Sequence, residues 1–266
     1  ELGCTVIQAE ARFTGPGEVI AGETTIKAKR FVIATGSRAA VPPIPGLETV
    51  CYFTNETIFE NRVRPEHLII IGGGPIGLEM AQAHHQLGTK VTVIEMGTIL
   101  PKDDPDLVAV IRDRIKADGI SLYEGAKTKE ILDVNDQIRV VIEHQGIEIT
   151  LEGSHLLLAT GRKPNIENLG LKDAGIEYTD RGISVDARLR TSNKKVFAIG
   201  DITGGLQFTH MAGYDAGIVI RNALFRLPAK VDHSAVPWVT YTNPELAQVG
   251  LTEKAAREQY GDDIRV

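Results

Sequence analysis

The stretch IIIGGGPIGLE, from Ile69 to Glu79, decides the fold of this chain. Its three apolar residues, continuous with Leu68, predict a strand that is buried on both faces, as in a parallel sheet. Residues 75–87 are rich in helix formers, and Gly88 suits the end of that helix. A buried strand, a glycine turn and a helix in this order predict the start of a βαβ unit.

The glycines of this stretch match the pattern G-x-G-x-x-G at Gly72, Gly74 and Gly77. The first glycine permits a tight turn, the second lets the backbone approach a pyrophosphate, and the third lets helix and strand pack closely. Pro75 suits the first helical turn, whose free N–H groups attract an anion. Together with Pro75 and Ile76, these glycines are predicted to bind a dinucleotide.

An acid follows at the end of the next predicted strand, residues 91–95. A carboxylate at Glu95 can accept both ribose hydroxyls of an adenosine, and it would repel a 2′-phosphate. Met96, Gly97 and Thr98 supply no arginine to hold that phosphate. The pattern therefore favours NAD over NADP, against the alternative of a solvated glutamate at a strand end.

Further elements follow from periodicity and turn residues. A helix is predicted to begin at Asp104-Pro105 and to end at Gly119, with Leu107, Val110, Ile111 and Ile115 on its apolar face. Residues 120–123 then predict a strand, and residues 139–143 and 148–151 predict an antiparallel hairpin around residues 144–147.

An internal repeat links two parts of the chain. FVIATGSRAAVPPIPGL begins at Phe31 and LLLATGRKPNIENLGL begins at Leu156. Each is an apolar strand, an Ala-Thr-Gly triplet and a proline-bearing loop, which indicates two related units. The glycine-rich βαβ pattern precedes only the second copy. We therefore expect that an amino-terminal part of the first unit has been removed from this chain.

Composition narrows the class of protein. The chain has 266 residues, 42% of them apolar, and a formal net charge of -6, which argues against a nucleic-acid-binding surface. The sequence contains no apolar run of about 18 residues, so no membrane helix is expected. Cys4 and Cys51 form neither a disulfide framework nor a zinc site, so a cytoplasmic location and no metal are expected. Cys51 is predicted to be buried as a small apolar side chain.

Several motifs in one order resemble a known family. They are the two Ala-Thr-Gly triplets, the glycine loop, Glu95, Gly200-Asp201, Phe208-Thr209-His210 and TNPELAQVGLTE from Thr242. The chain resembles the pyridine nucleotide-disulfide oxidoreductases, flavoenzymes that include dihydrolipoamide dehydrogenase, mercuric reductase and glutathione reductase. TNETIF at Thr54 and FTHMAGYDA at Phe208 look closer to the first two than to the NADP-dependent glutathione reductases.

The resemblance implies roles for individual residues. Gly161 would lie against the NAD, and Glu79 would sit at the junction of nicotinamide and flavin, although the helix dipole alone also explains an early-helix acid. Thr35, Gly36 and Ser37 would approach the FAD. The remaining residues implied at the flavin are Asp201, Gln207, Phe208, Thr209 and His210.

The implied fold is α/β, with a Rossmann-like NAD-binding domain inserted in a partial FAD-binding domain. The expected boundaries are 1–60 and 166–229 for the two FAD-domain segments, 61–165 for the NAD domain, and 230–266 for the start of an α+β dimerisation domain. The family's closely spaced cysteine pair and FAD glycine loop would lie upstream of Glu1. Its catalytic His–Glu pair would lie beyond Val266.

The chain is therefore expected to be the NAD-binding core of an FAD-dependent oxidoreductase. The family implies a homodimeric parent that acts on a disulfide, a dithiol or a mercuric ion. Alone, the chain should hold FAD weakly or not at all and should lack thiol–disulfide activity. An NADH oxidase or peroxidase-like flavoenzyme, or a non-catalytic nucleotide-binding module, remains an alternative, and the final electron acceptor is not determined.

Overall fold

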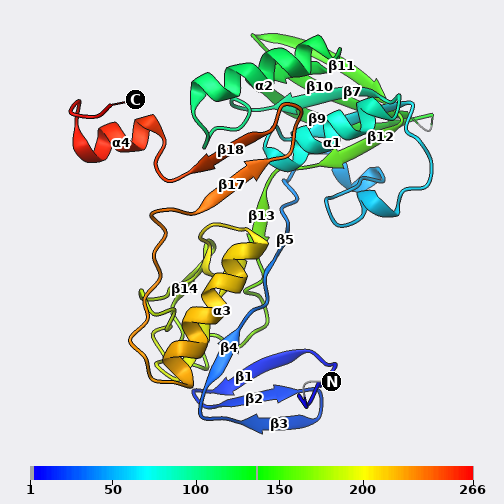
Figure 1. Cartoon of the computed structure of the whole chain (residues 1–266). Coiled ribbons are helices and arrows are strands. Elements are labelled where there is room, and N and C mark those ends of the chain that lie inside the picture. The colour runs from blue at the N-terminus through cyan, green and yellow to red at the C-terminus, as the bar shows by residue number, and fades with distance from the viewer. Residues whose placement is uncertain (1–2, 136, 266) are drawn as a thin grey trace. The chain divides into compact units, whose positions relative to one another are not determined.

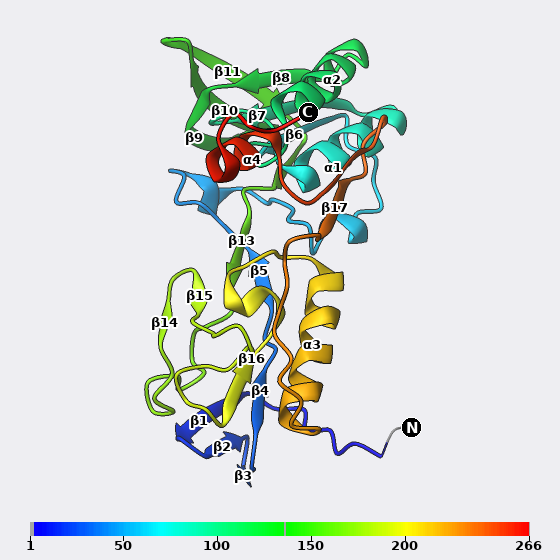
Figure 2. The ribbon, with the colours of Figure 1, turned by 60° about the vertical axis from the view of Figure 1, so that its left-hand side comes forward.

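The computed structural model describes residues 3–135 and 137–265. The chain divides into two compact units, one made of Glu1–Arg38 and Arg162–Asp232, the other of Ala39–Gly161 and His233–Val266. Figure 1 and Figure 2 show the elements of each unit from two directions. Both units are discontinuous in sequence. Residues 39–161 of the second unit separate the two segments of the first, and residues 162–232 of the first unit separate the two segments of the second.

The second unit is built on a parallel sheet of order β12-β6-β7-β8. Its strands are β6 (His67–Ile71), β7 (Lys90–Glu95), β8 (Ser121–Glu124) and β12 (His155–Leu158). Helix α1 (Pro75–Gln86) joins β6 to β7, and α2 (Pro105–Ala117) joins β7 to β8. The predicted βαβ unit is therefore confirmed. Gly88 follows the helix with a φ of 85°, as a left-handed residue after a helix end.

The central strand β6 is apolar throughout because both of its faces are covered. Leu68 and Ile70 pack with α1 and α2 in one cluster of buried side chains. Ile69 and Ile71 pack with side chains of a second, antiparallel sheet in another cluster. Alternate residues of a strand point to opposite faces, so the continuous apolar run places two cores on one strand.

The covering sheet is the meander β9 (Ala126–Val134), β10 (Gln137–His144) and β11 (Ile147–Gly153). The predicted hairpin is confirmed, with its strands longer than expected and a tight turn at Gln145-Gly146, where both φ values are positive. Strand β9 was not predicted, because five of the nine residues in AKTKEILDV are polar and only Ala126 and Ile131 are buried in it.

Two predictions about burial were wrong. Helix α2 buries Val108, Ile111 and Ile115, whereas Leu107 and Val110 are exposed. The helix contacts the core through one narrow stripe at spacings of three and four, and the broader stripe assumed from the sequence is not buried. Cys51 is exposed because its extended neighbour Val50 takes the inward position.

The first unit contains shorter elements. Its strands and helices are β1 (Ala11–Gly15), β2 (Glu18–Ala21), β3 (Thr24–Lys27), β4 (Phe31–Ile33), β13 (Arg162–Pro164), β14 (Tyr178–Thr179), β15 (Gly182–Ile183), β16 (Val196–Ala198), η3 (Gly200–Thr203) and α3 (Thr209–Ala223). Strand β5 (Ser37–Ala39) begins in this unit, and its last residue belongs to the second. Strand β4 pairs in parallel with β16, and β5 pairs with β13. The apolar strand predicted from Phe31 ends at Ile33, and residues 34–36 have no regular secondary structure.

The carboxy-terminal segment packs with the second unit. It contains the hairpin of β17 (Pro237–Thr240) and β18 (Leu246–Val249), followed by α4 (Glu253–Tyr260). The short 3-10 helices η1 (Leu47–Thr49) and η2 (Ile58–Glu60) belong to the same unit. Within residues 3–135 and 137–265, no helix has both the length and the apolar character that a bilayer crossing requires.

Candidate functional site

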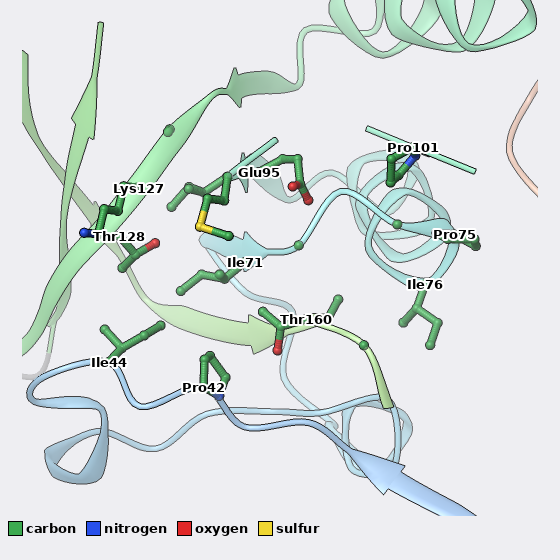
Figure 3. Close-up of a pocket in the computed structure, with 17 residues that line it drawn as sticks. Pro42, Ile44, Ile71, Pro75, Ile76, Glu95, Pro101, Lys127, Thr128 and Thr160 are labelled. Carbon is green, nitrogen blue, oxygen red and sulfur yellow. The ribbon is translucent and has the colours of Figure 1, made fainter. Parts of the chain in front are cut away.

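A cavity of about 530 Å³ opens in the second unit where β6 and β12 end. Six of the residues predicted to bind NAD line it: Gly72, Gly74, Pro75, Ile76, Glu95 and Gly161. Figure 3 shows the labelled members of this group around one space. The carboxyl ends of parallel strands are where open α/β sheets bind ligands. The structure therefore gathers residues that are up to 89 positions apart, from 72 to 161, at the expected edge.

The glycine turn is sterically required. Gly72 has a φ of 116°, and a Cβ there would lie 2.3 Å from the carbonyl oxygen of Ala159. Gly77 does not line the cavity; a Cβ on it would lie 2.0 Å from the carbonyl oxygen of Gly72. These contacts match the tight turn and the close packing of helix and strand that the motif predicts.

Gly74 differs from its neighbours, since a Cβ built on it meets no protein atom within 4 Å. Packing within the protein therefore does not require glycine here, whereas a ligand approaching the backbone would. Gly74 also precedes α1, and no described side chain caps that helix. The N–H groups of its first turn are consequently available to an anion, as a pyrophosphate site demands.

Glu95 forms one wall of the cavity with its carboxylate held in place. Oε2 accepts a hydrogen bond of 2.7 Å from the N–H of Gly73, and Oε1 accepts one of 2.7 Å from the N–H of Gly97. Each carboxylate oxygen has a further lone pair, so the group can accept two more donors, such as the two hydroxyls of a ribose. The structure thus orients Glu95 before any ligand binds.

The turn of residues 159–161 forms another wall. The N–H of Ala159 donates to Ile71, and the Thr160 hydroxyl donates to the carbonyl of Ala40 at 2.7 Å. Gly161 has a φ of 103°, and its carbonyl accepts the N–H of Ala40 at 2.9 Å. These bonds fix the triplet beside the glycine loop.

Sequence reasoning missed part of the lining. Lys127 and Thr128 enter from β9, the strand that was not predicted, and Figure 3 shows them across the cavity from Pro75 and Pro101. Pro42 and Ile44 come from the proline-bearing loop of the first Ala-Thr-Gly copy. The internal repeat was the one sequence signal that could have indicated this loop, because it relates the first Ala-Thr-Gly segment to the second, which was predicted to contact NAD.

The loop that follows Glu95 is anchored by a second acid. Glu124 accepts the N–H of Ile99 at 2.9 Å and pairs with Arg112 at 2.6 Å. Burial alone would raise the pKa of Glu124, but the Arg112 guanidinium and the Ile99 N–H outweigh it and hold the pKa below its ordinary value. The loop is therefore tied to β8 and α2.

Glu79 lies outside the cavity lining. Its Oε1 accepts the N–H of Tyr241 at 2.9 Å, so this carboxylate joins α1 to the residue after β17. One turn further on, Gln82 exchanges hydrogen bonds with the backbone of Asn243. The structure thus gives Glu79 a structural partner and leaves its implied place at the nicotinamide as a prediction.

The residues implied at a flavin lie in the first unit. The Ser37 hydroxyl donates to Asp201 at 2.5 Å and accepts from Arg162 at 2.7 Å, so the structure brings Ser37 and Asp201 together. Thr35 and Gly36 form the turn after β4. Gln207 and Phe208 precede α3, which begins at Thr209, and the rings of Phe208 and His210 stack at 5.3 Å. Among the described residues, no cluster of three or more His, Cys, Asp or Glu could hold a metal ion.

Comparison with known proteins gives the same family from two profiles. The profile described as pyridine nucleotide-disulphide oxidoreductase matches residues 2–216. The profile of the dimerisation domain of the pyridine nucleotide-disulphide oxidoreductases matches residues 236–266.

Individual relatives agree with these profiles. A mercuric reductase of Bacillus cereus is 39% identical over 97% of this chain and 41% of its own length. A dihydrolipoyl dehydrogenase of Geobacillus stearothermophilus is 35% identical over 97% of this chain and 56% of its own. The Cu(II) complex of RclA, an HOCl-induced flavoprotein disulfide reductase from Escherichia coli, is 32% identical, with a TM-score of 0.87 over 96% of this chain and 59% of that one. The chain thus spans about half the length of the curated relatives it matches.

Proposed function

The chain belongs to the pyridine nucleotide-disulphide oxidoreductase family, and from this premise we propose that its second unit binds NAD(H) in the cavity beside the glycine loop. The observation that carries the proposal is the pairing of an open backbone approach at Gly74 with an oriented carboxylate at Glu95. The first suits a pyrophosphate and the second suits a ribose diol.

Each wall of the cavity has a proposed task. The N–H groups at the start of α1, with Gly72 and Gly77 shaping the turn, hold the pyrophosphate. Glu95 accepts the ribose hydroxyls and disfavours a 2′-phosphate by charge repulsion. Gly161 lets the backbone of its turn lie against the cofactor, and Glu79 stands further along α1, toward the nicotinamide end.

For the whole protein we propose a flavin-dependent NADH:disulfide or mercuric oxidoreductase that works as a homodimer. NAD supplies hydride chemistry when it is bound. Ser37 and Asp201 belong to the proposed flavin site, with Thr35, Gly36, Gln207, Phe208, Thr209 and His210. The family assignment and the matched dimerisation segment support this proposal.

The assignment of NAD is tested by calorimetry on this chain. NADH and ADP-ribose should bind with similar affinity if the adenosine half carries recognition, and NADPH should bind at least about tenfold more weakly than NADH, which corresponds to 1.4 kcal/mol. Glu95→Ala should narrow the gap between NADH and NADPH. Equal affinities in the wild type, or tighter NADPH, would contradict the proposal.

A further inference from the structure

Met96 lines the cavity directly after Glu95, and the proposed function gives it no task. Its side chain is 76% exposed, whereas its apolar neighbours in the lining, Ile71, Ile94 and Ala126, are 7%, 1% and 1% exposed. A thioether on three rotatable bonds can adapt its shape to a molecule that lies against it. Met96 is therefore an adaptable apolar part of the cavity wall.

The covalent structure of adenosine brings the base close to this residue. The base is bonded to the ribose carbon next to the one that bears the 2′-hydroxyl, so it lies close to the group that binds the diol. Glu95 is the proposed diol acceptor, and two backbone N–H groups already fix its carboxylate. Figure 3 shows Ile44 and Ile71 around the same space as Glu95. The adenine ring would thus lie among apolar side chains that include Met96.

The three methionines of the chain differ in their exposure to solvent. Met211 is 5% exposed in α3 of the first unit. Met80 is partly buried and packs against a core cluster of the second unit. Of these three described residues, only Met96 is largely open to solvent. A dissolved oxidant would therefore reach the sulfur of Met96 before the other two.

We propose that Met96 is a redox-sensitive contact for the adenine ring, and that its oxidation to the sulfoxide weakens NAD(H) binding. The inference rests on the proposed function of the cavity and deepens it, because it adds a modification site that sets the affinity. Hydrogen peroxide is a sufficient oxidant. Its O–O bond breaks, an S–O bond forms, the sulfur gives up two electrons, and water leaves. The product is polar and no longer suits an apolar wall.

The test measures NADH and ADP-ribose binding to the full chain by calorimetry, before peroxide treatment and after the peroxide has been removed. The protein carries Cys4→Ser and Cys51→Ser, because both cysteines are exposed and also react with peroxide. Mass spectrometry of its peptides should show oxidation at Met96 ahead of Met80 and Met211. Both ligands should then bind about fivefold more weakly. Methionine sulfoxide reductases for the two sulfoxide epimers should restore the affinity.

Matched variants of this cysteine-free protein assign the loss to one sulfur atom. Met96→Leu has no sulfur at this position, so peroxide should leave both of its dissociation constants at their values before treatment. Met80→Leu keeps Met96 and should lose affinity on treatment as the cysteine-free protein does. Met96→Gln places a polar side chain of similar length in the wall. Without any oxidant, it should bind both ligands about fivefold more weakly than Met96→Leu does.

The possible failures are distinguishable. An untreated protein that binds neither NADH nor ADP-ribose refutes the proposed NAD site itself. Affinity that survives complete oxidation of Met96 refutes the redox role alone, as does an equal loss of affinity in treated Met96→Leu. Oxidation of Met80 ahead of Met96 also overturns the inference. Equal affinities of Met96→Gln and Met96→Leu would show that this side chain does not contact the adenine ring.

Discussion

The two Ala-Thr-Gly turns are built alike but have different neighbours. In each turn, the threonine hydroxyl and the glycine carbonyl form hydrogen bonds with the backbone of one residue from the other copy of the repeat. That residue lies four positions after the glycine of its own copy. The bonds are Thr160 to the Ala40 carbonyl and Ala40 N–H to Gly161 in the second unit, and Thr35 to the Asn165 carbonyl and Asn165 N–H to Gly36 in the first. Both glycines have a positive φ. The repeat in the sequence is therefore also a repeat in hydrogen bonding.

The two turns differ in whether a glycine loop and the start of a helix, which a pyrophosphate site requires, lie beside them. Strand β12, before the second turn, pairs with β6 and so lies beside a glycine loop and the start of a helix. Strand β4, before the first turn, pairs only with β16 among the described residues. The two turns thus differ in their neighbours, because only the turn of residues 159–161 has a glycine loop and a helix start beside it among the described residues.

The largest difference should appear when each region loses a glycine. Gly72→Ala places a methyl 2.3 Å from the Ala159 carbonyl oxygen at a φ of 116°, and should cost about 3 kcal/mol of unfolding free energy. Gly36→Ala meets no atom within 4 Å at a φ of 65°, and should cost only about 1 kcal/mol. Denaturant unfolding of both variants measures this. Equal costs would show that the close approach at Gly72 is relaxed in solution.

Nucleotide selectivity gives the next effect in size. The chain should bind NADH at least about 100-fold more tightly than FAD, because only the turn of residues 159–161 has a glycine loop beside it among the described residues. Absorbance of the purified protein and titration with each nucleotide measure the difference. A yellow protein with stoichiometric flavin would contradict the comparison.

Two ion pairs, one from each unit, should contribute differently to stability. Arg112→Met removes the partner of half-buried Glu124 and should cost about 2 kcal/mol at neutral pH. Arg38→Met removes an exposed partner of Glu167 and should cost less than about 1 kcal/mol. Arg38 and Lys163 lower the pKa of Glu167, so both carboxylates are charged at neutral pH.

The pH dependence of the Arg112 effect has a fixed sign. The pKa of Glu124 is lower in the folded state than its ordinary value of 4.5, so the stabilisation is present above that value and is lost as the pH falls through the folded pKa. The cost of Arg112→Met should therefore shrink toward zero below pH 4.5. Unfolding curves at several pH values test this, and a cost that grows on acidification would refute it.

The smallest effect concerns the two threonine hydroxyls. Thr160→Val removes a part-buried bond of 2.7 Å and should cost about 1 kcal/mol, while Thr35→Val removes an exposed bond of 3.0 Å and should cost about half as much. Thermal melting of the matched pair measures both costs. A larger loss for Thr35→Val would mean that the first turn depends more on its threonine than the second does.

The sequence predicted the parts of the fold that local pattern controls. Strand β6, the glycine turn, α1 and Glu95 all follow from apolar continuity and the steric needs of glycine. Strand β9 did not follow, because its burial is set by two residues whose partners lie in β10 and in the loop before η1. Because β9 was not predicted, Lys127 and Thr128 were not predicted to line the cavity either.

The orientation of individual side chains also could not be predicted from the sequence. Nothing in IIIGGGPIGLE shows that the N–H of Gly73 binds the Glu95 carboxylate, since the two residues meet only when β6 and β7 lie side by side. The exposure of Cys51 depends likewise on which neighbour faces the core. Tertiary contacts decide such points, and a periodic pattern cannot record them.

The most direct test of the account is a titration of isotope-labelled protein with NADH, followed by the backbone amide signals in NMR spectra. The signals of Gly72–Gly77, Gly97 and Gly161 should shift and saturate with one dissociation constant, while those of Thr35 and Gly36 stay in place. This result would locate the nucleotide at the turn that has a glycine loop beside it. Shifts centred on Thr35 and Gly36, with none at Gly72 or Gly161, would contradict the account.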